Sequence, residues 1–516
     1  LPRPPPPPMS PPHSLPLPLL LLLLLPLLLS LVVVVAGEED ASPQAPPPVS
    51  VAVVGAGMGG AALSHFLRTL FRTTPIPLHL HVFEEADRVG GRAHAVRVPV
   101  EGEGQEYDMV ETGGSIIIQA NHYVRGFAEE LGLELVPPTA EDSSPPFGVW
   151  NEGEAQLTLN ANRWKLLFYG QLLWRYGSLK MWSMSSTVKS VLARWNRLYQ
   201  LQDAGASFHT VEAFLHELGL FDMTQSSFDQ YYAGSALGTS LLHDEIIHGV
   251  ATTNYCQEPS SLHALVGMIS LAPMNAGPVL AVKGGFQQIP EGLLQSAGAK
   301  VHTSHRVSGI VRDGSKFVLR DSRGKAFSDS KFDYVVIATP LENSSLALNQ
   351  LRDLKLPPKR PYQLVHVTLV RGRLNPQRFG LTGESEIPSQ IIIAKSSTKP
   401  FFKSISRWKT FQDGSSVYKI FSDAKLQAKQ LQELFLEWEK PLLAEKQWKA
   451  YPTYRPPESF PEVELADNLF YINSIESAAS AYEVVSVWAR NVAFLIAEKA
   501  GVPKVEQADP AGRDEL

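Results

Sequence analysis

The chain has 516 residues, of which 44% are hydrophobic and 19% charged, and its formal net charge at pH 7 is −6. This is the composition of an ordinary globular protein, and the length exceeds what one compact core usually holds, so we expect two or more domains. Because nucleic-acid-binding proteins carry an excess of basic residues, the acidic balance predicts that this chain does not bind nucleic acid. The composition indicates no oligomeric state.

Residues 1–36 have the pattern of a secretory signal peptide, with Met9 as the expected start of translation. A proline-rich stretch precedes the apolar run Leu19–Ala36, which ends in small residues as signal peptides do before their cleavage site. The run also approaches the length of a membrane span, so an uncleaved signal anchor is the alternative. Residues 37–50 are rich in polar residues and proline and are predicted to form a linker.

A strand, a glycine-rich turn and a helix are predicted next. Val51–Val54 is an apolar run typical of a buried parallel strand, and the apolar spacing over Leu63–Leu70 indicates a helix. The G-x-G-x-x-G motif between them is typical of dinucleotide-binding turns. A second apolar strand, Leu78–Phe83, is followed by Glu84, whose carboxylate is placed to bind a ribose. The predicted cofactor-binding residues here are Gly55, Ala56, Gly57, Met58, Gly59, Gly60 and Glu84. NAD, FAD and a turn without ligand all remain open at this point.

The segment EEADRVGGR, residues 84–92, distinguishes the cofactors. It resembles the E-x(n)-V-G-G-R element of amine-oxidase-like flavoproteins, in which the element approaches the FAD diphosphate. Paired glycines allow close approach of the backbone, and an arginine brings a cation to a diphosphate. The resemblance therefore implies FAD as the cofactor and adds Glu85, Gly91 and Arg92 to the predicted binding residues.

Further motifs narrow the resemblance to the prenylcysteine oxidase family. The segment GQEYDMVETGGSIII, residues 104–118, is similar to a family element in which Glu111, Gly113, Gly114 and Ser115 match, with Asp108 as the alternative carboxylate. Residues 450–458 (AYPTYRPPE) and 469–496 are similar to two other family signatures. Two departures are Cys256, where the family commonly has glycine, and Lys283, which replaces the acid of an E-G-G turn. The similar segments are spread over about residues 50–500.

The implied fold class is α/β, with a discontinuous Rossmann-type FAD-binding domain and an interleaved α+β substrate-binding domain. The FAD domain is expected from three separate segments, and the substrate domain from a largely helical part and a sheet part. A tail, residues 503–516, ends in Arg513–Leu516 (RDEL), which is close to the K-D-E-L retrieval signal. The FAD segments are 51–135, 281–345 and 459–502, and the substrate segments are 136–280 and 346–458.

Two later segments are expected to contact the cofactor. The runs Val301–Arg312 and Lys316–Arg320 are predicted strands, and the resemblance implies that Val307 presents its backbone to adenine; a plain core valine is the alternative. Near the C-terminus, a strand, a loop and the helix Tyr482–Ala497 are predicted. The Glu476–Ala481 loop is expected to contact the isoalloxazine ring, because a helix N-terminus stabilises negative charge on a reduced flavin. A structural cap of that helix is the alternative.

Residues 159–200 are rich in aromatic side chains with helical spacing. They are expected either to line an apolar tunnel for an isoprenoid chain or to form part of the core. Cys256, the only cysteine, is expected to be a packed small hydrophobe rather than a reactive thiol. Arg175 and Arg490 are the candidate partners of a substrate carboxylate. Asn343 begins the only N-x-S/T sequon and is a predicted glycosylation site.

The family resemblance implies an FAD-dependent oxidase that cleaves the thioether of farnesyl- or geranylgeranyl-cysteine with O2 and water, giving cysteine, an isoprenoid aldehyde and H2O2. Such a reaction needs positioning and a dry flavin face more than a strong base, and no catalytic residue or metal site is assigned. The alternatives are a flavin amine oxidase or desaturase and a flavin-binding protein without turnover. The expected location is the secretory pathway, whether lysosome, cell exterior or endoplasmic reticulum, and a peripheral lipid association is left open.

Overall fold

The computed structural model describes Pro4 and residues 46–99, 107–138, 146–160, 164–235, 237–238, 240–275, 277–327, 330–348 and 351–503. The chain divides into two compact units, Leu1–Pro47 and Pro48–Leu516, and the fold described below is that of the second unit. Apart from Pro4, the predicted signal peptide lies outside the described residues, as does the RDEL tail. In the part of the chain that is described, no helix is both long and apolar enough to cross a membrane.

Six of the described strands form one sheet in the order β19-β20-β12-β1-β2-β9. All pairs are parallel except β19 with β20. The central strands β1 and β12 are apolar because helices or loops cover both faces of a parallel sheet. Three distant parts of the sequence supply the strands, which confirms the predicted α/β fold with a discontinuous Rossmann-type domain. The bounds are β1 Val49–Val54, β2 Leu78–Phe83, β9 Lys300–His302, β12 Tyr334–Ile337, β19 Glu464–Ala466 and β20 Leu469–Tyr471.

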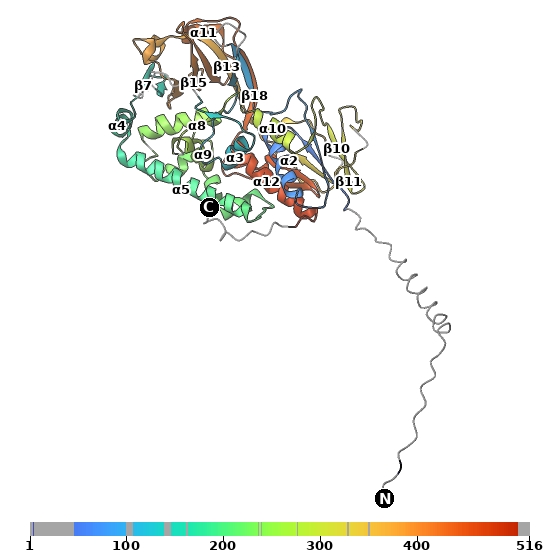
Figure 1. Ribbon diagram of the computed structural model, residues 1–516. Coiled ribbons are helices and arrows are strands. Elements are labelled where there is room, and N and C mark those ends of the chain that lie inside the picture. Colours follow the sequence, from blue (N-terminus) through green and yellow to red (C-terminus); the bar gives the residue numbers. More distant parts are fainter. Residues whose placement is uncertain are drawn as a thin grey trace. The chain divides into compact units, whose positions relative to one another are not determined.

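Helices α2 (Met58–Phe71) and α12 (Tyr482–Lys499) pack against each other beside this sheet (Figure 1). A Cβ atom on Gly59 of α2 would lie 3.0 Å from Val485 Cγ2 of α12, so the two helices approach closely. Helices α3 (His122–Glu130) and α10 (Gln288–Ser296) complete the layer. The N-terminal and C-terminal segments of the folded unit thus share one core.

The predicted strand over Val301–Arg312 was wrong in extent. The structure divides it into β9 and β10 (Gly309–Asp313), and β10 forms an antiparallel hairpin with β11 (Lys316–Arg320). The chain between β9 and β10 leaves the sheet at Ser304, whose positive φ of 57° breaks the extended conformation. The linker prediction was also two residues too long, since β1 begins at Val49.

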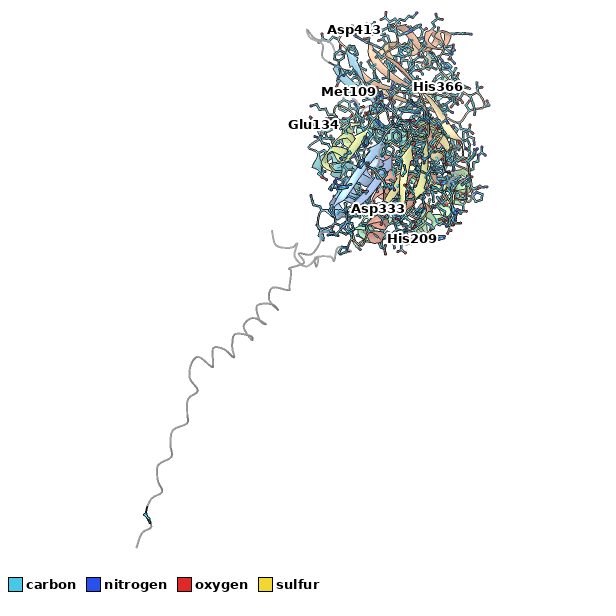
Figure 2. The ribbon with its side chains drawn as sticks, turned by 90° about the vertical axis from the view of Figure 1, so that its right-hand side faces the viewer. Met109, Glu134, His209, Asp333, His366 and Asp413 are labelled. Atoms are coloured by element: carbon cyan, nitrogen blue, oxygen red, sulfur yellow. The ribbon has the colours of Figure 1, made fainter. Side chains whose placement is uncertain are left out.

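A second sheet contains eight described strands, in the order β17-β13-β16-β15-β14-β6-β7, with β18 also paired to β13. Figure 2 shows His366 of β13 and Asp413 of the β15–β16 turn toward one end of the unit, and Asp333 and His209 toward the other. Strands β6 and β7 lie within the segment that was predicted to be largely helical. They form strands there because β6 pairs in parallel with the distant β14. The bounds are β6 Gly148–Asn151, β7 Gln156–Asn160, β13 Tyr362–Leu374, β14 Gln390–Ile393, β15 Ser404–Thr410, β16 Ser416–Ser422, β17 Phe435–Trp438 and β18 Ala444–Pro452.

After β7, the described part of that segment forms mainly helices. The bounds are α4 Lys165–Tyr176, α5 Ser178–Asp203, α6 Val211–Glu217, α7 Phe228–Tyr232, α8 His248–Tyr255 and α9 Ala264–Leu271. The smaller elements are β3 Ala95–Pro99, β4 Tyr107–Glu111, β5 Leu135–Val136, β8 Ala281–Val282, α11 Ala428–Leu434 and the short helices η1 Phe221–Thr224, η2 His243–Ile247, η3 Ala272–Met274, η4 Leu341–Asn343, η5 Pro376–Phe379, η6 Glu384–Glu386 and η7 Ile472–Ser477.

Candidate functional site

The glycine-rich turn joins β1 to α2 and forms one wall of a large cavity. Gly55 has φ +110°, a conformation that favours glycine, and a Cβ atom there would lie 2.8 Å from the Ala338 carbonyl oxygen. A Cβ on Gly60 would collide with the Gly55 carbonyl, so Gly60 serves the close packing of turn and helix. Of the predicted turn residues, Gly55, Gly57, Met58 and Gly59 line the cavity, whereas Ala56 and Gly60 lie behind them.

Glu84 at the end of β2 is buried and lines the same wall. Its Oε2 accepts a hydrogen bond from the Ala56 N–H at 2.9 Å, and its Oε1 accepts one from the Ala86 N–H at 3.0 Å. These bonds fix the carboxylate directly beside the glycine turn. Glu85 and Val307 also line this end, where Glu85 pairs with Arg306 at 3.4 Å. The structure thus brings together the residues predicted to bind the adenosine part of a dinucleotide.

The Val89–Arg92 segment packs on the glycine turn. The Gly90 N–H donates to the Ala56 carbonyl at 2.9 Å, and Gly57 and Gly90 form an isolated parallel bridge. Arg88 donates to the carbonyls of Val89, Gly91 and Ala93 and thereby holds the loop in shape. Close packing of the two loops is the role that paired glycines allow.

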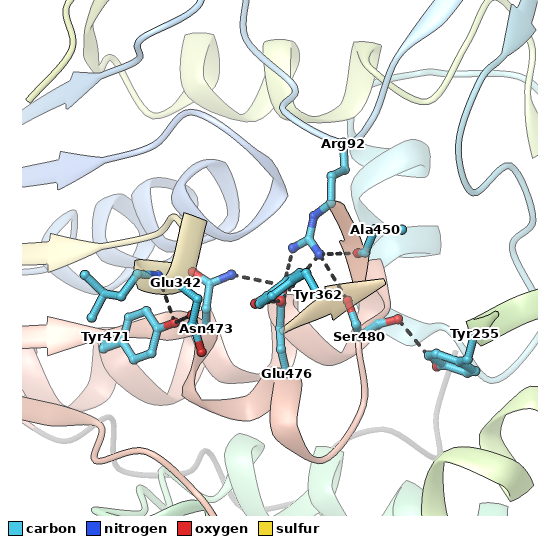
Figure 3. Close-up of polar contacts among 10 residues, drawn as sticks. Arg92, Tyr255, Glu342, Tyr362, Ala450, Tyr471, Asn473, Glu476 and Ser480 are labelled. Carbon is cyan, nitrogen blue, oxygen red and sulfur yellow. Dashed lines mark hydrogen bonds and ion pairs between the residues drawn. The ribbon is translucent and has the colours of Figure 1, made fainter. Parts of the chain in front are cut away.

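Arg92 leaves this loop and forms an ion pair with Glu476 of η7 (Figure 3). The guanidinium also donates to the Ala450 carbonyl at 2.9 Å and to Ser480 Oγ at 3.2 Å. Desolvation alone would lower the Arg92 pKa, but the Glu476 charge and hydrogen bond raise it above its usual value. The Arg92 charge is therefore compensated by Glu476, and both side chains line the cavity.

Glu476 has two further donors. Asn473 Nδ2 lies 3.0 Å from its Oε1, and the Tyr362 hydroxyl lies 3.1 Å from its Oε2. Only part of the Glu476–Ala481 loop, which was predicted to contact the flavin, faces the cavity. Glu476, Ser480 and Ala481 line the cavity, whereas the residues between Glu476 and Ser480 are buried behind it. Ala481 is the N-cap of α12 and no side chain caps this helix, so the alternative role as a capping loop is not supported.

Glu111 of β4 is the buried carboxylate of the family-like segment. Its Oε1 accepts a hydrogen bond from the Phe286 N–H, and burial raises its pKa. Among the described residues its Oε2 has no hydrogen-bond partner. The alternative, Asp108, is half-exposed and pairs with Lys409 at 3.6 Å. Of the two candidate carboxylates, Glu111 is therefore the buried one.

Lys419 of β16 is a cavity residue that was not among the predicted site residues. Its Nζ lies 3.4 Å from the Gly113 carbonyl, and burial lowers its pKa to about 8, opposed by the charge of Glu111. Side chains alternate between the two faces of β16, so Lys419 lies on the same face as Phe421, which also lines the cavity. This alternation is the sequence pattern that could have indicated the orientation of Lys419. The predicted residues Gly113, Gly114 and Ser115 all line the cavity, and a Cβ on Gly113 would lie 2.7 Å from the Trp448 ring.

An apolar arm of the cavity extends among α4, α5, α8 and α9. The side chains lining it include Phe168, Leu172, Met181, Met184, Trp195, Ile246, Val250, Leu265, Met268 and Ile269. The whole cavity, from the glycine turn to this arm, has a volume of about 1440 Å³. Single ligand pockets hold roughly 300–1,000 Å³, so there is room for a dinucleotide and a second molecule.

The two interpretations of the aromatic segment were each only partly right. Phe168, Tyr169 and Trp195 line the cavity, and Tyr176 and Tyr199 are buried and donate to Glu245 and Glu483. Neither interpretation foresaw that Trp164, Trp174 and Trp182 are exposed.

Arg175 and Arg490 do not line the cavity, so their proposed role with a substrate carboxylate was wrong. Arg175 pairs with Glu245 at 2.5 Å, and Arg490 pairs with Asp203 at 2.7 Å. Cys256 packs partly buried beside Val365 and Val367, and burial raises its thiol pKa to about 12, so the packing role is supported. Its φ of +54° accounts for the glycine expected there. Lys283 pairs with Glu134 at the surface.

The cavity fits FAD. The glycine turn supplies backbone for a diphosphate, Glu84 lies beside it for a ribose, and the cavity continues past Arg92 to the α12 N-terminus. That helix end offers partial positive charge for a flavin. The cofactor of this site is FAD, as the sequence predicts.

Comparisons with known proteins agree with this geometry. Residues 159–509 match the family model described as prenylcysteine lyase, and residues 53–131 match the NAD(P)-binding Rossmann-like domain. A farnesylcysteine lyase from Arabidopsis thaliana is 29% identical over 460 residues, which cover 87% of this chain and 88% of that protein. Prenylcysteine oxidase 1 from Homo sapiens is 30% identical over 478 residues, with the same two shares of 87% and 88%.

Among solved structures, the cyclohexylamine oxidase from Brevibacterium oxydans has the same fold, with a TM-score of 0.54 and 15% identity over 88% of this chain and 100% of that one. The family model covers more than half of the chain, and the relatives cover most of it. The chain therefore belongs to the prenylcysteine lyase family.

Proposed function

We propose that this chain is an FAD-dependent oxidase that cleaves the thioether bond of farnesyl- or geranylgeranyl-cysteine, compounds released when prenylated proteins are degraded. The observation that carries this function is one cavity lined both by the dinucleotide turn and by the apolar arm. The names of two relatives give farnesylcysteine and prenylcysteine as the compounds on which those proteins act.

The proposed reaction removes a hydride from the carbon between the sulfur and the double bond. When bound, FAD accepts the two electrons and passes them to O2, which becomes H2O2. Water adds to the oxidised carbon and loses a proton, and the C–S bond then breaks to leave an aldehyde and a thiol. In total, one thioether, one O2 and one water give one aldehyde, one cysteine and one H2O2.

The apolar arm supplies binding and orientation for this reaction. Met184, Leu265 and Met268 are buried side chains that line it, and burial of an isoprenoid chain there contributes about 25 cal/mol per Å² of apolar surface. A chain fixed in the arm would present its sulfur end to the polar middle of the cavity. Positioning of this kind lowers the barrier without a strong base.

Lys419 supplies a polar group at that middle region. Its Nζ, with a pKa of about 8, is partly neutral at physiological pH and can accept the proton that the attacking water loses. Glu111 lies beside it and keeps the pair close to electrical neutrality. We propose Lys419 as the group that holds this water.

A product assay with a matched pair of variants tests this function. Wild-type holoenzyme is expected to form aldehyde, cysteine and H2O2 in equal amounts from farnesylcysteine. Ile269→Trp fills the arm and is expected to lower kcat/KM at least about tenfold. Ile269→Val leaves the arm open and is expected to lower it by at most about fourfold, since one buried methylene contributes about 0.8 kcal/mol. Both variants should keep the FAD spectrum. Oxidation of amines but not of the thioether would instead support an amine oxidase, which the fold also allows.

The secretory location stays a proposal that rests on residues 1–36, the Asn343 sequon and the RDEL end. Asn343 ends η4, is half-buried and lines the adenosine end of the cavity. Expression in mammalian cells tests it: glycosidase treatment should shift the mass of wild-type protein and leave Asn343→Gln unchanged. A wild-type protein without a glycan, found in the cytosol, would contradict the proposal.

A further inference from the structure

Helix α4 is apolar on both of its faces. Leu172 and Tyr176 are buried on the inward face, while Leu166, Leu173 and Trp174 stand out from the outward face. Leu166 is 85% exposed and Trp174 is 87% exposed, although side chains of this kind are normally covered. A helix that is apolar all round is normally covered on every side or lies in a membrane.

The exposed side chains continue along the chain onto the start of α5. We define the α4 patch as Leu166, Leu167, Leu173, Trp174, Leu179 and Trp182, all of them exposed. Trp164 and Tyr169 are exposed in the same segment, and the remaining exposed large hydrophobic side chains of the described residues are scattered along the sequence. Figure 1 shows α4 at the outer edge of the unit, on the side away from the β10–β11 hairpin. A concentrated apolar patch of this kind marks a surface that another phase or molecule covers.

The basic charge of the sequence around α4 and α5 favours a negatively charged partner for the α4 patch. No Asp or Glu occurs between Glu154 and Asp203, whereas Lys and Arg occur at seven positions in that interval. Of these seven, Arg175 and Arg197 pair with Glu245 and Glu217 from outside the interval. The chain as a whole is acidic, with a formal charge of −6. Lys180 and Lys189 lie on α5, Lys180 between the patch residues Leu179 and Trp182 in the sequence. Tryptophan and lysine together are typical of the interface with anionic lipid.

The cavity reaches the same surface. Phe168, Tyr169 and Leu172 of α4 line it, as do Met181 and Met184 of α5. Tyr169 is 61% exposed to solvent and also lines the cavity, so the cavity opens beside the α4 patch. An apolar chain leaving a bilayer at this opening would enter the arm without crossing water.

We propose that the α4 patch docks on an anionic lipid bilayer and that the apolar arm opens into that bilayer. The docking stands on the surface alone, whereas the entry of a prenyl chain by this route also rests on the proposed function. The mode is that of an interfacial helix, which lies in the headgroup region and does not span the membrane.

Vesicle flotation of the holoenzyme tests the docking. The test variant is Leu166→Ser, Trp174→Ser and Trp182→Ser combined; the control carries Leu356→Ser, Leu364→Ser and Leu436→Ser, which are exposed elsewhere. Wild type and control should float with phosphatidylcholine vesicles that contain phosphatidylserine, and less with phosphatidylcholine alone. The test variant should lose about tenfold or more in vesicle affinity, because three exposed apolar side chains that would insert into the bilayer are removed.

Three results would overturn the proposal: wild type that does not float, a test variant that floats like wild type, and a patch that joins two copies of the chain in solution without binding vesicles. Flavin reduction by dissolved farnesylcysteine distinguishes a failure of membrane docking from a failure of the proposed oxidase function. None of the three substituted side chains lines the cavity, so the test variant should be reduced like wild type by dissolved substrate. It should be at least roughly tenfold slower only with substrate held in vesicles.

Discussion

Arg92 and Glu476 form an ion pair although 384 residues separate them in the sequence. Arg92 follows the second strand of the nucleotide-binding sheet, and Glu476 precedes its last helix, so the pair closes the cavity wall between the first and third segments of the domain. The same wall lies next to β18, through the Ala450 carbonyl. The pair also has polar contacts with the second sheet, through the Ala450 carbonyl of β18 and the Tyr362 hydroxyl of β13.

Substitution of Glu476 tests that ion pair. Glu476→Gln removes the negative charge and leaves Arg92 in the cavity wall without its counterion. We expect a loss of about 2 kcal/mol in the free energy of unfolding, measured by urea denaturation, together with weaker FAD retention on dialysis. The control, Glu439→Gln, removes a surface partner of Arg371 and should cost roughly 0–1 kcal/mol. Equal effects of the two substitutions would contradict the importance of the Arg92–Glu476 pair.

Gly60 tests the packing of the glycine turn. Gly60→Ala places a Cβ against the Gly55 carbonyl, so we expect a loss of about 1–3 kcal/mol and a lower FAD content. Gly126 is the matched control, because it is exposed in α3 and a Cβ added there would meet no heavy atom within 4 Å beyond its chain neighbours and the backbone of its own helix. Gly126→Ala should stabilise the protein by about 0.5–1 kcal/mol. Thermal unfolding and flavin absorbance measure both; a normal FAD content in Gly60→Ala would refute the packing role.

Glu483 should make stability depend on pH. This buried carboxylate accepts hydrogen bonds from the N–H groups of Tyr123 and Val124 and from the Tyr199 hydroxyl, and burial raises its pKa from 4.5 to about 7. A raised pKa means that the folded state binds the proton more tightly. Its contribution is complete below pH 4.5 and is lost as the pH rises through about 7, by about 3 kcal/mol in total.

The measurement is urea denaturation from pH 4.5 to 8 for wild type and Glu483→Gln. The difference in unfolding free energy between the two proteins should change in that window, because glutamine does not titrate. A difference that stays constant with pH would show that Glu483 does not bind a proton there.

Lys419 should set the pH dependence of product formation. Its neutral form increases as the pH rises through about 8, so turnover of farnesylcysteine should rise over the same range. Lys419→Met should lower kcat at least about tenfold and remove that rise, since general-base effects are typically this large or larger. Lys425→Met, which breaks a surface pair with Glu445, should keep the wild-type profile. A Lys419→Met enzyme with the wild-type profile would exclude this role.

Local patterns explain what the sequence predicted correctly. The strand, turn and helix around Gly55–Gly60 and the acid at Glu84 follow from residue spacing alone, and the family-like motifs identify FAD. Tertiary pairing explains the errors. Arg175 and Arg490 form ion pairs with Glu245 and Asp203 instead of lining the cavity, and no local sequence pattern indicates these pairs. Likewise, β6 joins the second sheet through the distant β14.

Lys419 and the α4 patch were not predicted from the sequence, for a physical reason common to both. A lysine in a strand normally faces solvent, and tryptophans at helical spacing normally face a core. Each of these expectations is reversed here: Lys419 faces the cavity, and Trp174 faces outward. Departures of this kind occur where function overrides packing preference.

Whether this chain oxidises prenylcysteines is tested most directly by the anaerobic addition of farnesylcysteine to the purified, yellow holoenzyme, followed by its visible spectrum. We expect that the flavin absorbance bleaches, that it returns when air is admitted, and that one aldehyde and one cysteine form for each flavin reduced. A flavin that stays yellow with farnesyl- and geranylgeranyl-cysteine would refute the proposed function, and would point to a family member that binds FAD without oxidising prenylcysteines.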